Sequence, residues 1–317
     1  MSTFAHNFTV GAAINPSVAL RMQTPLTMEA LQHYAPSAFA TSAHESRSDR
    51  YTYIPTSEII TGLMREGFQP FSATQSRCRI AGKSEFTKHM VKFRHPDSFS
   101  AIQKVGDSVP EVVLVNSHDG TSAYKLSAGL YRLVCSNGLM VSDSTVQMVK
   151  VQHKGNIVDQ VIEGSFEIVQ QSEKALARAD EWNQLQLTAG EQAAFADAAR
   201  TLRFADAEGE IKTPITAEQL LRPRRDADAP EHAVTDWRRP AVPKPDLWHT
   251  LNVVQENVVR GGLHAWQQGI DQFTGRKTAR RVTTREVRGI DQDVKLNRAL
   301  WMLAEKMAEL KGVAVAA

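Results

Sequence analysis

Residues 112–141 constrain the fold more than any other part of the chain. Residues 112–116 (VVLVN) have the composition of a strand. The Asp-Gly pair at 119–120 then favours a hairpin turn, because glycine tolerates a positive φ. A second strand is expected over residues 121–127. From Ala128 the apolar residues take a helical spacing, which the Asn-Gly pair at 137–138 would end. The stretch therefore predicts a hairpin that leads into a short buried helix.

The flanking segments predict an antiparallel sheet with helices on one face. Residues 56–66 should form a helix with Thr56 as its N-cap. Further strands are expected over 71–80, 86–94, 145–151 and 156–169. Helices should follow over residues 171–185 and from Thr188, which has capping-box spacing to Glu191. The fold class is therefore α+β.

The pattern of periodic and irregular segments predicts four parts. They are an N-terminal arm (1–50), an α+β core (51–204), a proline-rich connector (205–247) and a C-terminal helical module (248–317). The arm has poor periodicity, and the connector is rich in proline, which lacks an amide donor and fixes φ. The last part consists of two helices on either side of a basic loop.

Composition places the chain among globular proteins. It is 42% hydrophobic and 23% charged, with a formal net charge of only +2. A nucleic-acid hypothesis therefore depends on a local cluster of cations. The two cysteines form no CxxC pair, which suits a reducing cytoplasm. No signal peptide and no apolar run of about 20 residues is recognisable, so we expect a cytoplasmic protein without membrane contact.

The sequence contains no pattern that indicates catalysis. Cys135 follows an apolar stripe, and nothing nearby suggests a paired base, so we expect a core residue. His118 and Asp119 suit a hairpin turn without any function. The chain has no HExxH, P-loop, GxGxxG or GxSxG motif. We therefore expect no enzyme, no metal and no cofactor.

Two groups of cations are candidates for binding nucleic acid. The basic loop carries six cations against one acid, Glu286: Arg276, Lys277, Arg280, Arg281, Arg285 and Arg288. Such a cluster neutralises phosphates and releases their counterions. A second group alternates along the strands expected over 71–80 and 86–94: Arg77, Arg79, Lys88, Lys92 and Arg94. Alternation places these cations on one sheet face, which is either a solvated outer face or a phosphate-facing groove.

Three segments resemble family 932 of the domains of unknown function. They are GLYRLVCSNGLMV at 129–141, LWHTLNVVQENVVRGGL at 247–263 and IDQDVKLNRALW at 290–301. Its members are phage- and plasmid-like proteins of prophages and conjugative plasmids, so the resemblance implies a mobile-element setting. It supplies no reaction and no catalytic residue.

The expected order of helix, three strands and helix is also similar to the core of single-strand annealing proteins that form rings on DNA. This likeness would place both groups of cations along one groove for a single-stranded backbone. It is incomplete, because the sequence offers only Phe86, Phe93 and Tyr124 as candidates for base stacking.

We therefore expect a non-catalytic protein that binds nucleic acid, above all single-stranded DNA, in the recombination or transfer of a mobile element. An alternative from another class stays open, namely a protein-interaction factor that counters a host defence or repair system. Further copies of the chain and a host protein stay open as additional partners.

Overall fold

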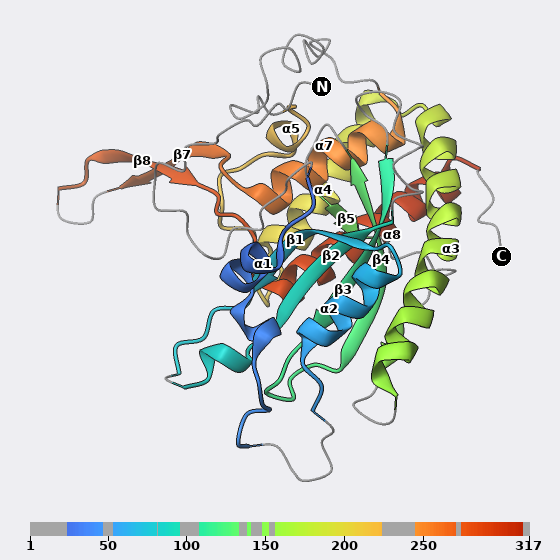
Figure 1. Ribbon diagram of the computed structural model, residues 1–317. Helices are drawn as coiled ribbons and strands as arrows, with labels where there is room; N and C mark the ends of the chain where they lie inside the picture. The colour runs from blue at the N-terminus through green and yellow to red at the C-terminus, as the bar shows by residue number, and fades with distance from the viewer. Residues whose placement is uncertain are drawn as a thin grey trace, which may run out of the picture.

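A six-stranded antiparallel sheet forms the centre of the protein (Figure 1). The computed structural model describes residues 24–46, 53–80, 82–95, 108–132, 138–140, 148–151, 156–223, 245–270 and 274–312. The strands are β1 (Gln69–Gln75), β2 (His89–Arg94), β3 (Ser108–Asn116), β4 (Tyr124–Arg132), β5 (Gly138–Met140) and β6 (Val149–Val151). Their order is β1-β2-β3-β4-β5, and β6 pairs with the other end of the same edge of β4.

Helices pack on both faces of this sheet. The helices of the described chain are α1 (Met28–Tyr34), α2 (Thr56–Arg65), α3 (Ile157–Gln184), α4 (Ala189–Phe204), α5 (Ala217–Leu220), α7 (Leu247–Arg260) and α8 (Ile290–Leu310). Two short 3-10 helices are η1 (Pro36–Phe39) and η2 (Ser84–Phe86). Figure 1 shows α2 and α3 across one face and α8 behind the other. The predicted α+β class with an antiparallel sheet and a C-terminal helical part is confirmed, and that C-terminal part supplies the helix on the second face.

Alternation along β2 directs its side chains to the two helical layers. Val91 and Phe93 are fully buried in the cluster that includes α2 and α3. Met90 points the other way and packs in a smaller cluster with Val113 and Ile290, the first residue of α8. Because successive strand residues face opposite sides, a sheet covered on both sides needs apolar residues at both sets of positions.

Three tryptophans hold α3 against the C-terminal helices. The rings of Trp182 in α3 and Trp301 in α8 lie 4.6 Å apart between centroids. Trp248, near the start of α7, lies 6.3 Å from the first and 6.4 Å from the second. All three side chains are at most 2% exposed. Aromatic contacts of this kind add to the large apolar area that each ring buries.

The predicted helix after the hairpin is wrong, since Ala128 and the residues up to Arg132 continue β4. Leu126, Ala128 and Leu130 are all buried on one face, so the apolar residues alternate with period two through this part. A short apolar run is compatible with both the helical and the strand period. Here β4 pairs with β3 from Lys125 to Arg132, and this pairing stabilises the strand.

The predicted strand over 156–169 is also wrong, because this segment is the first half of α3. Asn156 caps the helix by accepting a hydrogen bond from the amide of Asp159. Ile157, Val161 and Ile168 are buried at helical spacing. Their β-branched side chains favour strands in isolation, and packing against the sheet outweighs that preference.

Residues 24–46 of the expected N-terminal arm are packed structure. Leu26, Leu31 and Ala38 are at most 3% exposed and belong to the same cluster as the sheet and α8. The amide of Leu26 also donates to the carbonyl of Pro70 at the edge of the sheet. These residues of the predicted arm thus contribute to the core, and residues 1–23 lie outside the described part. The other boundaries between the four parts stay predictions.

Replacing Trp301 by alanine should lower the free energy of unfolding by about 3–5 kcal/mol, because the change leaves a cavity between α3, α7 and α8. Met302→Ala on the same helix is the matched control, since its side chain is 53% exposed and should cost under about 0.5 kcal/mol. Urea denaturation of both variants measures the difference. Equal stability of the two would contradict the role given to the tryptophans.

Candidate nucleic-acid interface

A two-stranded ribbon projects from the body of the protein. It consists of β7 (His264–Ile270) and β8 (Lys277–Thr283), which pair antiparallel and form a sheet of their own. Figure 1 shows it extending away from the other elements. The basic loop expected between the C-terminal helices is therefore wrong over residues 277–283, which are a strand. A sequence signal was present, because Thr278, Val282 and Thr283 are β-branched residues, which are enriched in strands.

The register of the ribbon assigns its side chains to two faces. Trp266 is opposite Arg281, and Ile270 is opposite Lys277. These four residues share one face, which we call the tryptophan face. The next pair along, Gln267 and Arg280, occupies the other face. Arg280 and Arg281 are neighbours in sequence, so they necessarily point to opposite sides.

The tryptophan face is exposed although it is partly apolar. Trp266 is 61% exposed and Ile270 is 70% exposed. A lone two-stranded ribbon is only marginally stable in water, and large exposed apolar side chains commonly mark a binding surface. Sequence analysis missed Trp266 as a stacking candidate. The available signal was the even spacing of Trp266 and Ile270, which puts two large apolar side chains on one face if the segment is a strand.

The ribbon is basic. Lys277, Arg280 and Arg281 of β8 are exposed, as is Arg276 just before it. Neither strand contains aspartate or glutamate, and the sequence of the turn between them has one acid, Asp271. Within the described part of the chain, none of these four side chains forms an ion pair. Their charges are thus available to a ligand rather than used inside the fold.

The ribbon is anchored firmly at its root. The amide of Gly262 donates to the carbonyl of Thr284 at 2.7 Å, and the amide of Thr284 donates to Leu263 at 2.8 Å. Arg203 of α4 reaches across and donates to the carbonyls of Val258 at 3.2 Å and Arg285 at 3.1 Å. These bonds fix the direction in which the ribbon leaves α7.

The two remaining cations of the expected basic loop lie beyond the ribbon. Arg285 is exposed, and Arg288 is exposed with its Nε 3.7 Å from a carboxylate oxygen of Glu286. Arg288 and Lys92 line one small hollow between β2 and the segment that leads into α8. The structure therefore brings one member of each predicted cationic group together.

The second predicted group does not form a cationic sheet face. Arg77 and Arg79 are exposed, but they lie in the loop after β1, which ends at Gln75. Lys88 precedes β2, and its Nζ forms an ion pair with Asp291 at 2.6 Å. Lys92 is only 4% exposed. Lys92 and Arg94 do share one face of β2. The predicted solvent-accessible cationic face is nevertheless wrong, because α8 covers that side of the sheet and the other three cations lie outside the strands.

Arg94 is a structural residue. It is 3% exposed, and its Nε and Nη2 both donate to Oε1 of Glu111 at 2.8 Å. Its guanidinium lies between the rings of Phe71 and Tyr131, with Cζ 4.2 Å and 3.6 Å from their centroids. A phosphate cannot reach this group in the folded protein. The aromatic candidates Phe93 and Tyr124 are likewise fully buried, and Phe86 is half-buried beside His44.

Comparison with known proteins identifies the family. The family model described as "Domain of unknown function (DUF932)" matches residues 43–301. The chain belongs to this family. UPF0380 protein YafZ of Escherichia coli (strain K12) is 44% identical over 288 residues, covering 91% of this chain and 93% of the relative. UPF0380 protein YfjQ of the same strain is 44% identical over 289 residues, with the same coverage. No solved structure matches.

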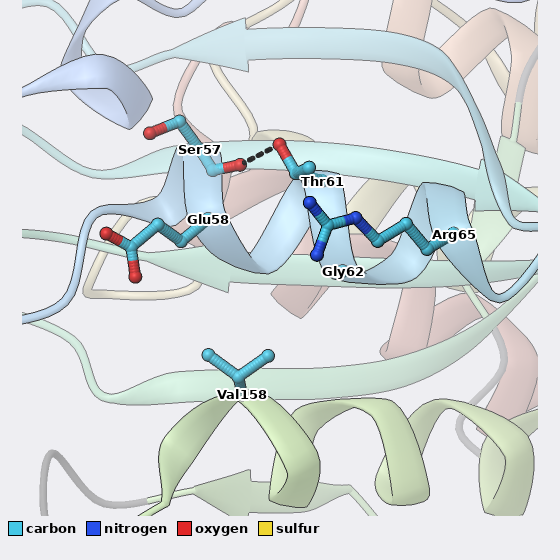
Figure 2. A pocket seen from close by; sticks show the side chains of 6 residues that line it. All are labelled: Ser57, Glu58, Thr61, Gly62, Arg65 and Val158. Atoms are coloured by element: carbon cyan, nitrogen blue, oxygen red, sulfur yellow. Dashed lines mark hydrogen bonds between the residues drawn. The ribbon is translucent and has the colours of Figure 1, made fainter.

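The described part of this DUF932 protein has a hollow on its surface beside α2. It has a volume of about 350 Å³ and lies between α2 and the start of α3. Figure 2 shows its lining: Ser57, Glu58, Thr61, Gly62, Arg65 and Val158. The Thr61 hydroxyl donates to the carbonyl of Ser57 at 2.8 Å and is thus engaged within the helix. The lining offers one carboxylate and one guanidinium but no histidine or cysteine, and we assign it no chemistry.

A buried polar network lies where α2 meets the sheet. Thr56 is the first residue of α2 rather than its N-cap, and Pro55 occupies the cap position. The Thr56 hydroxyl lies 2.9 Å from Nε2 of His89 and 3.1 Å from Nε2 of His118, and it accepts a bond from Asn116 at 3.1 Å. A hydroxyl has one proton, so it donates to one imidazole and accepts from the other.

His118 and Asp119 lie in the turn between β3 and β4, as expected. His118 is fully buried and Asp119 is 6% exposed, whereas Gly120 and Thr121 are exposed. Burial acts to raise the pKa of Asp119, but hydrogen bonds from Thr121 and Ser117 and the nearby Lys83 hold it below its usual value. Cys135 lies outside the described residues.

Two general findings concern only the described residues of this family member. None of their helices is long and apolar enough to cross a membrane. They also contain no group of three or more histidine, cysteine, aspartate or glutamate side chains placed to hold a metal ion.

Acid should destabilise the protein partly through His89. Burial, and then the neighbouring His118, lower the pKa of His89 to about 3 from an ordinary value of 6.5. Between these values the unfolded chain binds a proton here that the folded protein does not. The free energy of unfolding should therefore fall, as pH drops below 6.5, by up to about 1.4 kcal/mol per pH unit.

Urea denaturation at pH 7, 5.5 and 4.5 measures this dependence. His89→Gln should be less stable at pH 7 but show a shallower decline. His264→Gln, at an exposed position on the ribbon, should keep the decline of the parent protein. An unchanged decline in His89→Gln would refute the assignment.

Gly261→Ala should lower the free energy of unfolding by roughly 3 kcal/mol. Gly261 has φ +64° and ψ −153°, a region that residues with a Cβ rarely occupy. An added Cβ would lie 2.4 Å from the carbonyl carbon of Arg285 and would push the root apart. Gly190→Ala, in helix α4 with open space around it, is the control and should change stability by less than about 1 kcal/mol. A Gly261→Ala variant as stable as this control would contradict the prediction.

Proposed function

We propose that this DUF932 protein binds single-stranded nucleic acid without catalysing a reaction, and that the β7–β8 ribbon is its contact surface. The observation that carries the proposal is the tryptophan face. It combines exposed Trp266 and Ile270 with Lys277 and Arg281, on strands that contain no carboxylate. Stacking on an aromatic ring together with a cationic track is the common way to bind a single strand.

A single strand fits this face better than a duplex does. Bases in a duplex are stacked on each other, so Trp266 would have to intercalate at a cost of a few kcal/mol. An unpaired base presents its ring directly. The indole of Trp266 can then stack while Arg281, directly across the ribbon, binds the adjoining phosphate.

The biological setting belongs to the same proposal. The resemblance to phage- and plasmid-like proteins suggests recombination or transfer of a mobile element, in which single-stranded DNA is exposed. Single-stranded DNA is accordingly the first ligand to test, and the overall charge of +2 means that binding should depend on the ribbon's local charge.

The experiment separates stacking from charge. Fluorescence anisotropy with labelled oligo-thymidylate gives the affinity over a range of salt concentrations. Trp266→Ala should weaken binding by about 1–3 kcal/mol at every salt concentration without changing the salt slope. Arg281→Gln should instead lower the slope of log affinity against log salt by about 0.7, the value for one phosphate on a single strand.

Lys306→Gln is the matched control for charge. Its side chain on α8 is 68% exposed and distant in sequence from the ribbon, so affinity and slope should stay at the parent values. Absence of binding by the parent protein at low salt, or equal effects of Arg281→Gln and Lys306→Gln, would overturn the proposal.

A further inference from the structure

The second face of the ribbon carries a separate group of hydrogen-bond donors. The register places Gln267 opposite Arg280 and Gly269 opposite Thr278, so all four positions share the face that points away from Trp266. We call this the arginine face. All four residues are exposed. They lie on two adjacent cross-strand pairs, so one small ligand can contact them together.

The chemistry of the arginine face suits an oxyanion. A guanidinium has five N–H donors and no acceptor, and the glutamine amide and the threonine hydroxyl add further donors. Among the described residues, the side chains of Thr278 and Arg280 form no hydrogen bond or ion pair. No carboxylate on either strand competes for them.

Gly269 leaves the threonine hydroxyl uncovered. A Cβ at this position would lie 3.1 Å from Oγ1 of Thr278, which is tighter than an ordinary contact. Glycine inside a strand weakens it, and it often marks a place where a ligand approaches the backbone closely. Here it allows the Thr278 hydroxyl to lie over the neighbouring strand, next to Arg280.

We propose that the arginine face is a subsite for a phosphodiester group, bound by the guanidinium of Arg280 and the hydroxyl of Thr278 over Gly269. This inference rests on the proposed function, because the phosphodiester belongs to the nucleic acid whose base stacks on Trp266. The nucleic acid therefore contacts both faces of the ribbon. The tryptophan face stacks a base and binds the phosphate beside it, and the arginine face binds a further phosphodiester of the same strand.

The test combines a protein variant with a neutral backbone. Thr278→Val keeps the shape of the side chain and removes the hydroxyl, and it should weaken binding of oligo-thymidylate about tenfold or more, as for a hydrogen bond to a charged group. With an oligonucleotide of the same length that carries uncharged methylphosphonate linkages, the parent protein should bind more weakly. Thr278→Val should then bind it as the parent does.

Gly269→Ala tests the same subsite from the other strand. It should weaken binding of oligo-thymidylate to a similar extent, because the new methyl group displaces the hydroxyl. Thr201→Val on α4 and Gly190→Ala are the matched controls, and both should bind like the parent protein. Thermal denaturation of every variant confirms that it is folded.

The outcomes distinguish the two proposals. If the parent protein does not bind oligo-thymidylate, the proposed function fails. If it binds and Trp266→Ala weakens it, while Thr278→Val and Gly269→Ala bind like their controls, only the phosphodiester subsite fails. An equal loss in Thr278→Val for the charged and the neutral oligonucleotide also overturns the subsite, since the hydroxyl would then act through the fold.

Discussion

The contact among Trp182, Trp248 and Trp301 is the interaction on which the rest of the structure depends. It joins the end of α3, which lies across the sheet, to α7 and α8, which come from the C-terminal part of the chain. Eleven of the 14 residues of α7 are buried, so this helix cannot shift without disturbing its surroundings. The ribbon begins directly after α7. The tryptophan contacts that hold α7 in place therefore also fix where the ribbon leaves the body of the protein.

The protein thus combines a tightly packed support, formed by the sheet with α3, α7 and α8, with an exposed surface, the β7–β8 ribbon. Polar bonds inside the support also fix its register, as where Gln255 of α7 donates to Asn297 of α8 at 2.8 Å. In the described structure the ribbon has little such packing, because only Ala265 of β7 packs against the core. Its order near the root comes from backbone bonds, from Arg203, and from Gln219, which donates to the carbonyl of His264 at 3.0 Å. An element with few buried contacts suits a surface that has to adapt to a flexible ligand.

The sequence predicted the start of α4 correctly, because the capping box of Thr188 and Glu191 marks it chemically. It failed where local pattern and long-range pairing disagree. The spacing of Leu126 and Leu130 fits one face of a helix. Their pairing with residues of β3, which the local sequence does not show, places them in a strand. For the candidate site, the cations of residues 276–288 were found from charge alone. Trp266 was missed, because its exposure depends on the ribbon standing apart from the core.

The buried pair of Arg94 and Glu111 restricts how this sheet can change over evolution. Loss of Glu111 would leave an uncompensated guanidinium between Phe71 and Tyr131, and loss of Arg94 would leave the buried carboxylate of Glu111 unpaired. Either change typically costs about 3–5 kcal/mol. A well-packed apolar pair could replace both residues at little cost, but each single step towards it loses that stability. We therefore expect selection to keep the pair or to exchange both members together, which limits the residues that the sheet face under α8 can carry.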